Sequence, residues 1–220
     1  MQKFPLVVAI FFALCVAVHA QTATNAESAE ANYTRTITKR SAEIVAALAL
    51  TEAGKSNRVQ EILVGQYRAL NTWHDQHDAE IKALNKTGGD KEAAERAKTK
   101  VAEVQATLKP THDSFLTKLG AELTPEQVET VKDKMTYGKV QFTYKGFLQA
   151  VPDMTEEEKA HVLDMLKEAR ELAIDGGSAE EKTAIFGKYK GKINNYLSKQ
   201  GHDVGGKGKA KAAPPTSSDK

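Results

Sequence analysis

Cysteine is almost absent from this 220-residue chain, in which Cys15 is the only one. It lies in the apolar stretch 6–18, which is shorter than the roughly 20 residues that cross a bilayer. Lys3 before this stretch and the small residues Val18 and Ala20 after it are typical of a secretory signal peptide, residues 1–20, cleaved after Ala20. Cleavage removes Cys15, so the mature chain is predicted to have no disulfide, no thiolate ligand and no cysteine nucleophile.

The sequence also lacks a marked excess of positive or negative charge. Removal of Lys3 from 31 basic residues leaves 30 against 29 acidic residues, which argues against nucleic-acid binding. The last stretch, "GGKGKAKAAPPTSSDK", has almost no apolar content beyond alanine. Such a composition cannot offset the entropy lost on ordering, so residues 204–220 are predicted to form a disordered basic tail.

Catalytic fingerprints are lacking as well. The chain contains no H-E-x-x-H, P-loop, G-x-S-x-G or dinucleotide-binding motif. No cofactor is therefore predicted, and any site must be inferred from single clusters of residues.

Helix-start signals are plentiful, and "ELTPEQVETV" at 122–131 shows the pattern best. Thr124 can accept a hydrogen bond as N-cap, Pro125 fits the first helical position, and Gln127 can reach back to complete a capping box. Thr155 with Glu158, and Ser178 with Glu181, repeat the pattern. Thr51 offers a fourth start, weakened by the glycine at position 54.

Between these starts, apolar residues recur with the period of an α-helix, and nothing indicates a sheet. The sequence predicts an all-α fold, a helical bundle or elongated helical hairpins, in one domain over 33–203. "NKTGGD" at 85–90 separates two long helices, and Pro110 should kink or split the second of them. The alternation of Val140, Phe142 and Tyr144 predicts a short extended aromatic loop near 137–147.

One cluster, "WHDQHD", has the composition of a metal site. His74 lies three residues before His77 and four before Asp78, so a helix places them on one face, and imidazole and carboxylate suit zinc or a related divalent metal. A second pair, His112 and Asp113, follows Pro110. In a symmetrical hairpin the two pairs lie about 11 residues out of register, or about 16 Å, which argues against one joint site. Ordinary hydrogen-bonded pairs are the alternative.

Aromatic and basic residues gather in "FTYKGF" and "KYKGKINNYL". Aromatic rings could stack on sugars or apolar peptides, lysines could bind acidic groups, and asparagines could donate hydrogen bonds. The alternative is that the rings fill the core while the lysines extend to solvent. The candidate ligand-binding residues are Tyr137, Phe142, Tyr144, Lys145, Phe147, Tyr189, Lys190, Lys192, Asn194, Asn195 and Tyr196.

Two resemblances follow from these segments. "FLTKLGAELTPEQ" resembles the LTxxQ motif of Spy- and CpxP-type periplasmic helical proteins, which bind unfolded proteins or respond to envelope stress. "LTPEQVETVKDKMTYGKVQFTYKGF", "QYRALNTWHDQHDAEIKAL" and the segment "EARELAIDGGSAEEKTAIFGKYKGKINNYLSKQGHD" resemble the secreted bacterial family catalogued as domain of unknown function 3826, over about 35–203. This second resemblance implies a mainly helical, exported protein in a carbohydrate-degradation context.

Together these features predict an exported protein, periplasmic or secreted, without a transmembrane anchor after cleavage. The leading interpretation is a non-enzymatic binding or accessory protein for a polypeptide or an acidic glycan. The alternative is a metal-dependent or acid–base enzyme acting on carbohydrate through the His and Asp residues. The oligomeric state stays open.

We expect the exported chain to begin at Gln21, because signal peptidase reads the small residues at Val18 and Ala20. Intact-mass measurement of the protein recovered from the periplasm or the medium checks this. A protein that still begins at Met1 in those fractions contradicts the prediction.

Overall fold

The computed structural model describes residues 8–86 and 90–204, with side chains described from Ser28 onward. Within these residues the chain forms helices and no strand, which confirms the all-α prediction. The contacts separate the chain into two compact units, residues 1–131 and 132–220. Each unit is described by itself, and one domain over 33–203 stays a prediction.

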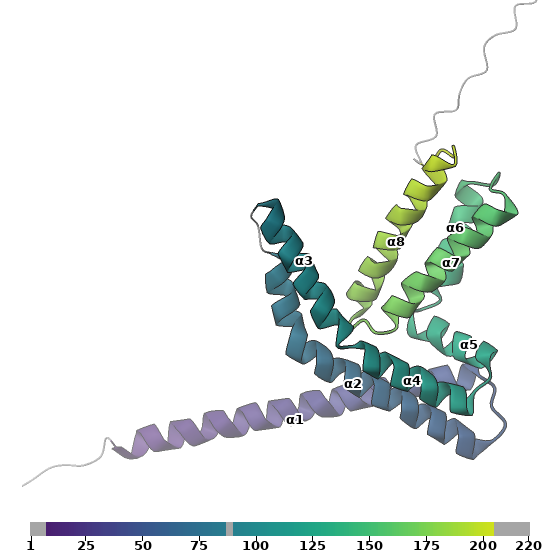
Figure 1. Cartoon of the computed structure of the whole chain (residues 1–220). Coiled ribbons are helices and arrows are strands. Elements are labelled where there is room, and N and C mark those ends of the chain that lie inside the picture. The colour runs from purple at the N-terminus through teal and green to yellow at the C-terminus, as the bar shows by residue number, and fades with distance from the viewer. Residues whose placement is uncertain (1–7, 87–89, 205–220) are drawn as a thin grey trace, which may run out of the picture. The chain divides into compact units, whose positions relative to one another are not determined.

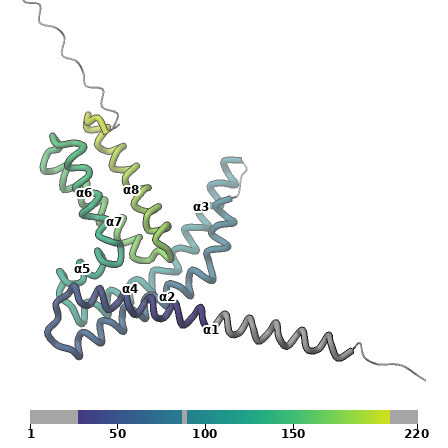
Figure 2. The backbone as a smooth tube through the Cα atoms, turned by 180° about the vertical axis from the view of Figure 1, so that it is seen from behind, coloured from purple at the N-terminus to yellow at the C-terminus, as the bar shows by residue number. Residues whose placement is uncertain are grey.

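The first unit is organised around α2 (Ala53–Asn85), the longest helix after α1 (Val8–Ala47). α1 packs along one side of α2, and α3 (Lys91–Ala106) and α4 (Lys109–Glu122) follow one another along another side (Figures 1 and 2). The apolar stripes meet in a core whose members are Ile37, Ile44, Leu48, Val59, Leu63, Leu70, Trp73, Val104, Phe115, Leu119 and Leu123.

The predicted breaks occur where the sequence places them. α2 ends at Asn85 and α3 begins at Lys91, with Asp90 accepting from the Ala93 N–H at 2.8 Å as N-cap. Pro110 splits the predicted long helix into α3 and α4, because it lies in the first turn of α4, where its missing N–H removes no helical bond.

Three of the four predicted helix starts are confirmed. Thr124 and Gln127 exchange backbone-to-side-chain hydrogen bonds of 3.1 and 3.3 Å at the start of α5 (Pro125–Met135). Thr155 forms a complete capping box at α7 (Glu156–Ala173), and Ser178 caps α8 (Ala179–Lys199). Thr51 is the exception, because Glu52 occupies the N-cap of α2 without a side-chain bond.

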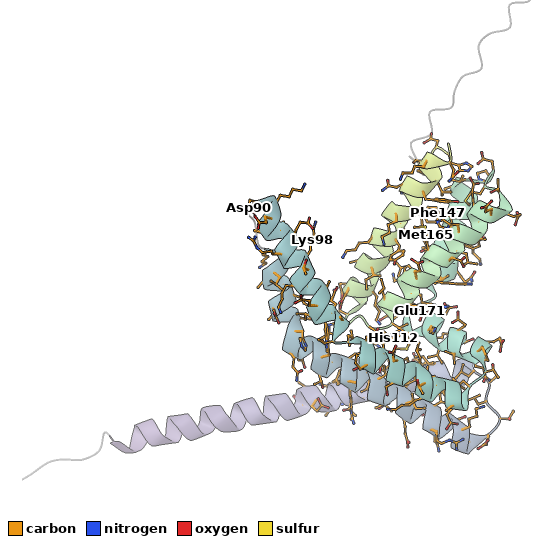
Figure 3. All side chains as sticks on the ribbon, in the orientation of Figure 1. Asp90, Lys98, His112, Phe147, Met165 and Glu171 are labelled. Carbon is orange, nitrogen blue, oxygen red and sulfur yellow. The ribbon has the colours of Figure 1, made fainter. Side chains whose placement is uncertain are left out.

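The second unit packs α6 (Lys139–Ala150), α7 and α8 side by side, with α6 against α7 and α7 against α8. Their shared core consists of Val140, Val151, Met154, Val162, Leu166, Ala169, Ala173, Phe186, Tyr189, Ile193 and Leu197. Phe147 of α6 and Met165 of α7 pack against this core (Figure 3).

The predicted extended loop at 137–147 is wrong, since α6 covers most of it. Val140 and Thr143 are buried, and Tyr144 and Phe147 pack on the core, which is the spacing of one helix face. Phe142, the middle of the supposed alternation, is 77% exposed on the opposite face. The alternation therefore consisted of the buried Val140, the exposed Phe142 and the half-buried Tyr144, all on one helix.

Two polar interactions close the ends of α7. The Lys182 ammonium donates to the carbonyls of Ala173 and Ile174 at 2.7 and 3.2 Å, where α7 ends and its carbonyls lack helical partners. His202 Nε2 lies 3.0 Å from the Glu158 carboxylate at the start of α7. The end of α8 is thereby attached to the start of α7.

No helix within residues 28–86 and 90–204 has an apolar stretch that could span a bilayer. The predicted signal peptide falls before Ser28, where no side chain is described, and the predicted tail beyond Val204 lies outside the described residues.

A pair of glycines on α6 tests the correction of the 137–147 loop. Gly138, the N-cap, has φ 64°, so Gly138→Ala should lower the free energy of unfolding by about 1 kcal/mol. Gly146 lies within the helix with open space around it, so Gly146→Ala should raise it by up to about 1 kcal/mol. Urea denaturation measures both. If both substitutions changed the free energy of unfolding in the same direction, the assignment of α6 as a helix would be contradicted.

Candidate functional site

A groove of about 720 Å³ lies between α2 and α4, within the first unit. Its lining combines apolar, polar and charged side chains from both helices: Arg58, Glu61, Ile62, Gly65, Gln66, Ala69, Pro110, Thr111, Ser114, Phe115, Lys118 and Glu122. The lining thus places a few apolar side chains beside charged and polar groups that could orient a ligand.

Two polar contacts fix α2 against the α3–α4 segment, one at Glu122 of α4 and one at Thr107, the C-cap of α3. Arg58 donates to the Glu122 carboxylate through Nε at 2.8 Å and Nη2 at 3.0 Å. Fifteen residues further along α2, Trp73 donates through Nε1 to Thr107 Oγ1 at 2.9 Å, and Thr107 lies fifteen residues before Glu122. The helices are therefore antiparallel in one constant register, which places Gln66 opposite Ser114.

Gln66 has an unusual environment for an amide. Its side chain lines the groove and is 6% exposed, and its Nε2 has no hydrogen-bond partner among the described residues. A buried donor without a partner costs about 1–3 kcal/mol. The terminal amide torsion is soft, so the orientation of the amide group can adjust to a partner.

Gly65, next to it, lies in the middle of α2 and lines the same groove. A Cβ added there would meet nothing within 4 Å, so packing does not require a glycine. A glycine at such a position costs about 1 kcal/mol relative to alanine. Gly65 and Gln66 therefore both lower stability at one point of the groove.

The predicted metal residues on α2 are engaged with each other and with the helix. His74, 7% exposed, lies with Nδ1 2.8 Å from Asp78 Oδ1. His77 lies with Nδ1 2.8 Å from the Trp73 carbonyl oxygen, and its ring stacks on the Trp73 indole at 4.7 Å between centroids. These contacts match the hydrogen-bonded alternative.

The second predicted pair lies on α4, where Figure 3 labels His112. Asp113 accepts from Lys109 at 2.6 Å, and in the observed register His112 is about six residues, or about 9 Å, from the level of His74. No three His, Cys, Asp or Glu side chains within the described part of the chain gather as metal ligands would. The geometry thus gives the metal hypothesis no joint site.

The predicted aromatic residues divide into two groups. Tyr189 is a member of the core of the second unit, and Tyr144, Phe147 and Tyr196 pack against it. Tyr196 also contacts His161, with ring centroids 4.2 Å apart. For these four rings the structure favours the core-filling alternative.

The other predicted residues reach solvent. Tyr137 and Phe142 are 51% and 77% exposed, and Tyr137 has φ 59°, which is rare for a large side chain. Lys192 places its ammonium 4.1 Å from the centre of the Tyr189 ring, and Lys145, Lys190 and Asn195 are exposed while Asn194 is half-buried. No described pocket is lined by these residues, so a ligand site there stays a prediction.

Comparison with known proteins bears on the whole helical region. The sequence model of a family described as "Protein of unknown function (DUF3826)" matches residues 34–212. The chain belongs to this family. No curated protein matches the sequence. The comparisons do not show the resemblance to Spy- and CpxP-type proteins. They assign no function to the DUF3826 family, so the function has to be inferred from the geometry of the structure.

Sequence reasoning missed the groove of this DUF3826 protein. Glu61 and Gly65 do not lie on the apolar stripe of α2, so no pattern marks them. Ser114 and Lys118, which line the other wall of the groove, lie about fifty residues away, beyond a helix break. One signal was present. Gln66 stands between Leu63 and Leu70 on the apolar stripe of α2, where a polar residue breaks the helical pattern.

Electrostatics stabilise one end of the groove. The hydrogen bond from Arg58, opposed by some desolvation, holds the pKa of the Glu122 carboxyl below its ordinary value, and the same hydrogen bond raises the pKa of Arg58. Glu122 therefore stays ionised and paired in the DUF3826 groove at neutral pH.

We expect Glu122→Gln to lower the free energy of unfolding at pH 7. A lowered carboxyl pKa contributes stability above its unfolded value, and this is lost as the pH falls through the folded pKa. The difference from wild type should therefore shrink below about pH 4. Urea denaturation of both proteins at about five pH values from roughly pH 3 to pH 7 measures this difference in the free energy of unfolding.

Glu43→Gln is the matched control, because Glu43 forms only an exposed 4.0 Å pair with Lys39 on α1. If Glu122→Gln behaves like this control at every pH, the pair does not hold α2 against α4.

Proposed function

We propose that this protein is an exported, non-enzymatic binding protein whose ligand lies in the α2–α4 groove. The observation that carries the proposal is the unpartnered amide of Gln66 beside Gly65, because both residues lower the stability of the free protein at one site. Selection for a bound ligand explains such a site, since a ligand can supply the missing hydrogen bond.

The chemistry of the lining supports binding over catalysis. Its residues, all described, include no histidine and no cysteine, so the Ser114 hydroxyl has no imidazole base beside it. Glu122 is paired with Arg58 and its lowered pKa disfavours a proton-donating role. The enzyme alternative would depend on His74 with Asp78, which lie on α2 outside the lining.

Export supports a binding role in the envelope or the medium. The first twenty residues carry the signal-peptide pattern, and the sequence offers a polypeptide or an acidic glycan as ligand classes. A groove of about 720 Å³ is within the usual size of small-ligand or short-segment sites.

Blocking the groove tests the proposal. Ser114→Trp fills it from α4, and should weaken binding at least about tenfold because the indole occupies ligand volume. The probes are a fluorescein-labelled pool of random dodecapeptides with equal Lys and Glu content, and fluorescein-labelled oligogalacturonate. Fluorescence anisotropy measures both, and we expect at least one probe to bind the wild type.

Thr117→Trp is the control, because Thr117 is exposed on α4 and does not line the groove. It should bind as the wild type does. Absence of binding by the wild type, or equal binding by Ser114→Trp, contradicts the proposed function.

A further inference from the structure

The lining of the α2–α4 groove carries equal numbers of basic and acidic side chains, and only some of them form ion pairs. Arg58 and Lys118 face two carboxylates, Glu61 and Glu122. Arg58 and Glu122 neutralise each other, whereas Glu61 on α2 and Lys118 on α4 are exposed and form no ion pair with a described residue. The groove thus presents one free carboxylate and one free ammonium from opposite walls.

This balance bears on the class of ligand. An acidic glycan would gain from Lys118 but would be repelled by Glu61. Because Arg58 and Glu122 neutralise each other, the groove has no net positive charge to attract it. A neutral glycan is usually held by an exposed aromatic face, and Phe115, the aromatic residue of the lining, is 2% exposed. A polypeptide with both basic and acidic side chains complements both walls.

The amide of Gln66 indicates the conformation of that polypeptide. A primary amide offers a donor and an acceptor, the same pair that a peptide group needs. A helical ligand satisfies its backbone internally and has no carbonyl for Nε2, whereas an extended chain presents N–H and C=O groups along its length. The hydroxyls of Thr111 and Ser114 on the facing wall offer further partners.

Gly65 provides the close approach that an extended backbone requires. It lines both the α2–α4 groove and a second depression of about 470 Å³ on α2, whose other members are Asn57, Gln60, Glu61, Val64 and Arg68. The missing side chain lowers the ridge between the two hollows. Backbone can therefore lie on α2 at this point, with a side chain reaching the second depression.

The length of the groove sets the size of the segment. From Arg58 to Ala69 α2 rises about 17 Å at about 1.5 Å per residue. An extended chain covers about 3.3 Å per residue, so about five residues fill the groove.

We propose that the α2–α4 groove binds an extended polypeptide segment of about five residues and balanced charge, with Gln66 bonding its backbone and Gly65 admitting it. This inference rests on the proposed binding function and names its ligand class.

The experiment uses the two probes above with three variants of the purified protein. Gly65→Ala should raise the unfolding midpoint by about 2–4 °C and weaken binding of the peptide pool at least about tenfold. Gln66→Leu should remove the backbone bond without unfolding the protein, and weaken the pool at least about fivefold. Gly120→Ala on α4 is the matched control, because its Cβ also meets open space but lies outside the lining. It should raise the midpoint similarly and leave binding unchanged.

A conformational comparison completes the test. The tightest peptide of the pool is compared with a hydrocarbon-stapled form of the same sequence, whose backbone is held helical. The extended inference expects the stapled form to bind at least about tenfold more weakly.

The outcomes separate the inference from the function on which it rests. Unchanged peptide binding by Gly65→Ala and Gln66→Leu, or preference for the stapled form, overturns the inference. If oligogalacturonate binds and these variants weaken it while the peptide pool does not bind, the binding function stands and the polypeptide ligand is wrong. If the wild type binds neither probe, the proposed binding function and the inference about its ligand are both contradicted.

Discussion

The register between α2 and α4 is the constraint on which the candidate site depends. Arg58 with Glu122 of α4, and Trp73 with Thr107 at the end of α3, hold α2 antiparallel to the α3–α4 segment at fixed levels. Between these contacts, Leu63, Leu70, Phe115 and Leu119 bury their side chains. A shift of one residue would place a neighbour of Gln66, which points about 100° away around α2, at the level of Ser114. Because Cys15 is the only cysteine of the sequence, no disulfide within the chain can hold the register.

Two neighbouring residues at the centre of this helix pair lower the stability of the free protein. Many local signals agree with the fold: caps begin helices, proline stands in a first turn, and apolar stripes face the cores. Helix glycines in open space also occur at Gly120 and Gly146, so a glycine by itself does not mark a site. Gly65 and Gln66 depart from this agreement next to each other, one by weakening the helix and one by burying an unpartnered amide. Departures that coincide in space with a groove are where functional demands are expected. Single departures, such as the exposed Phe142, carry less weight.

The helices were largely predictable, because their signals are local. Thr124, Thr155 and Ser178 each act within three residues of themselves, and Pro110 acts within one turn. The segment at 137–147 was misjudged because Val140 and Tyr144 fit both a period of two and a helix face, and only packing on α7 decides between them. The groove could not be predicted, since it depends on the pairing of residues some fifty positions apart across the α3–α4 break.

The LTPEQ segment shows why a motif and a site should be judged by different tests. The backbone N–H groups of Thr124 and Gln127 each find an oxygen of the other's side chain, so the motif is complete without a ligand. A similar motif in Spy- and CpxP-type proteins needs only the same helix-start chemistry. Gln66 is the opposite case: its Nε2 finds no partner within the described chain, and the free protein is less stable for it. An interaction that is satisfied internally explains the fold, whereas the unpartnered amide beside the groove is the observation on which the proposed ligand depends.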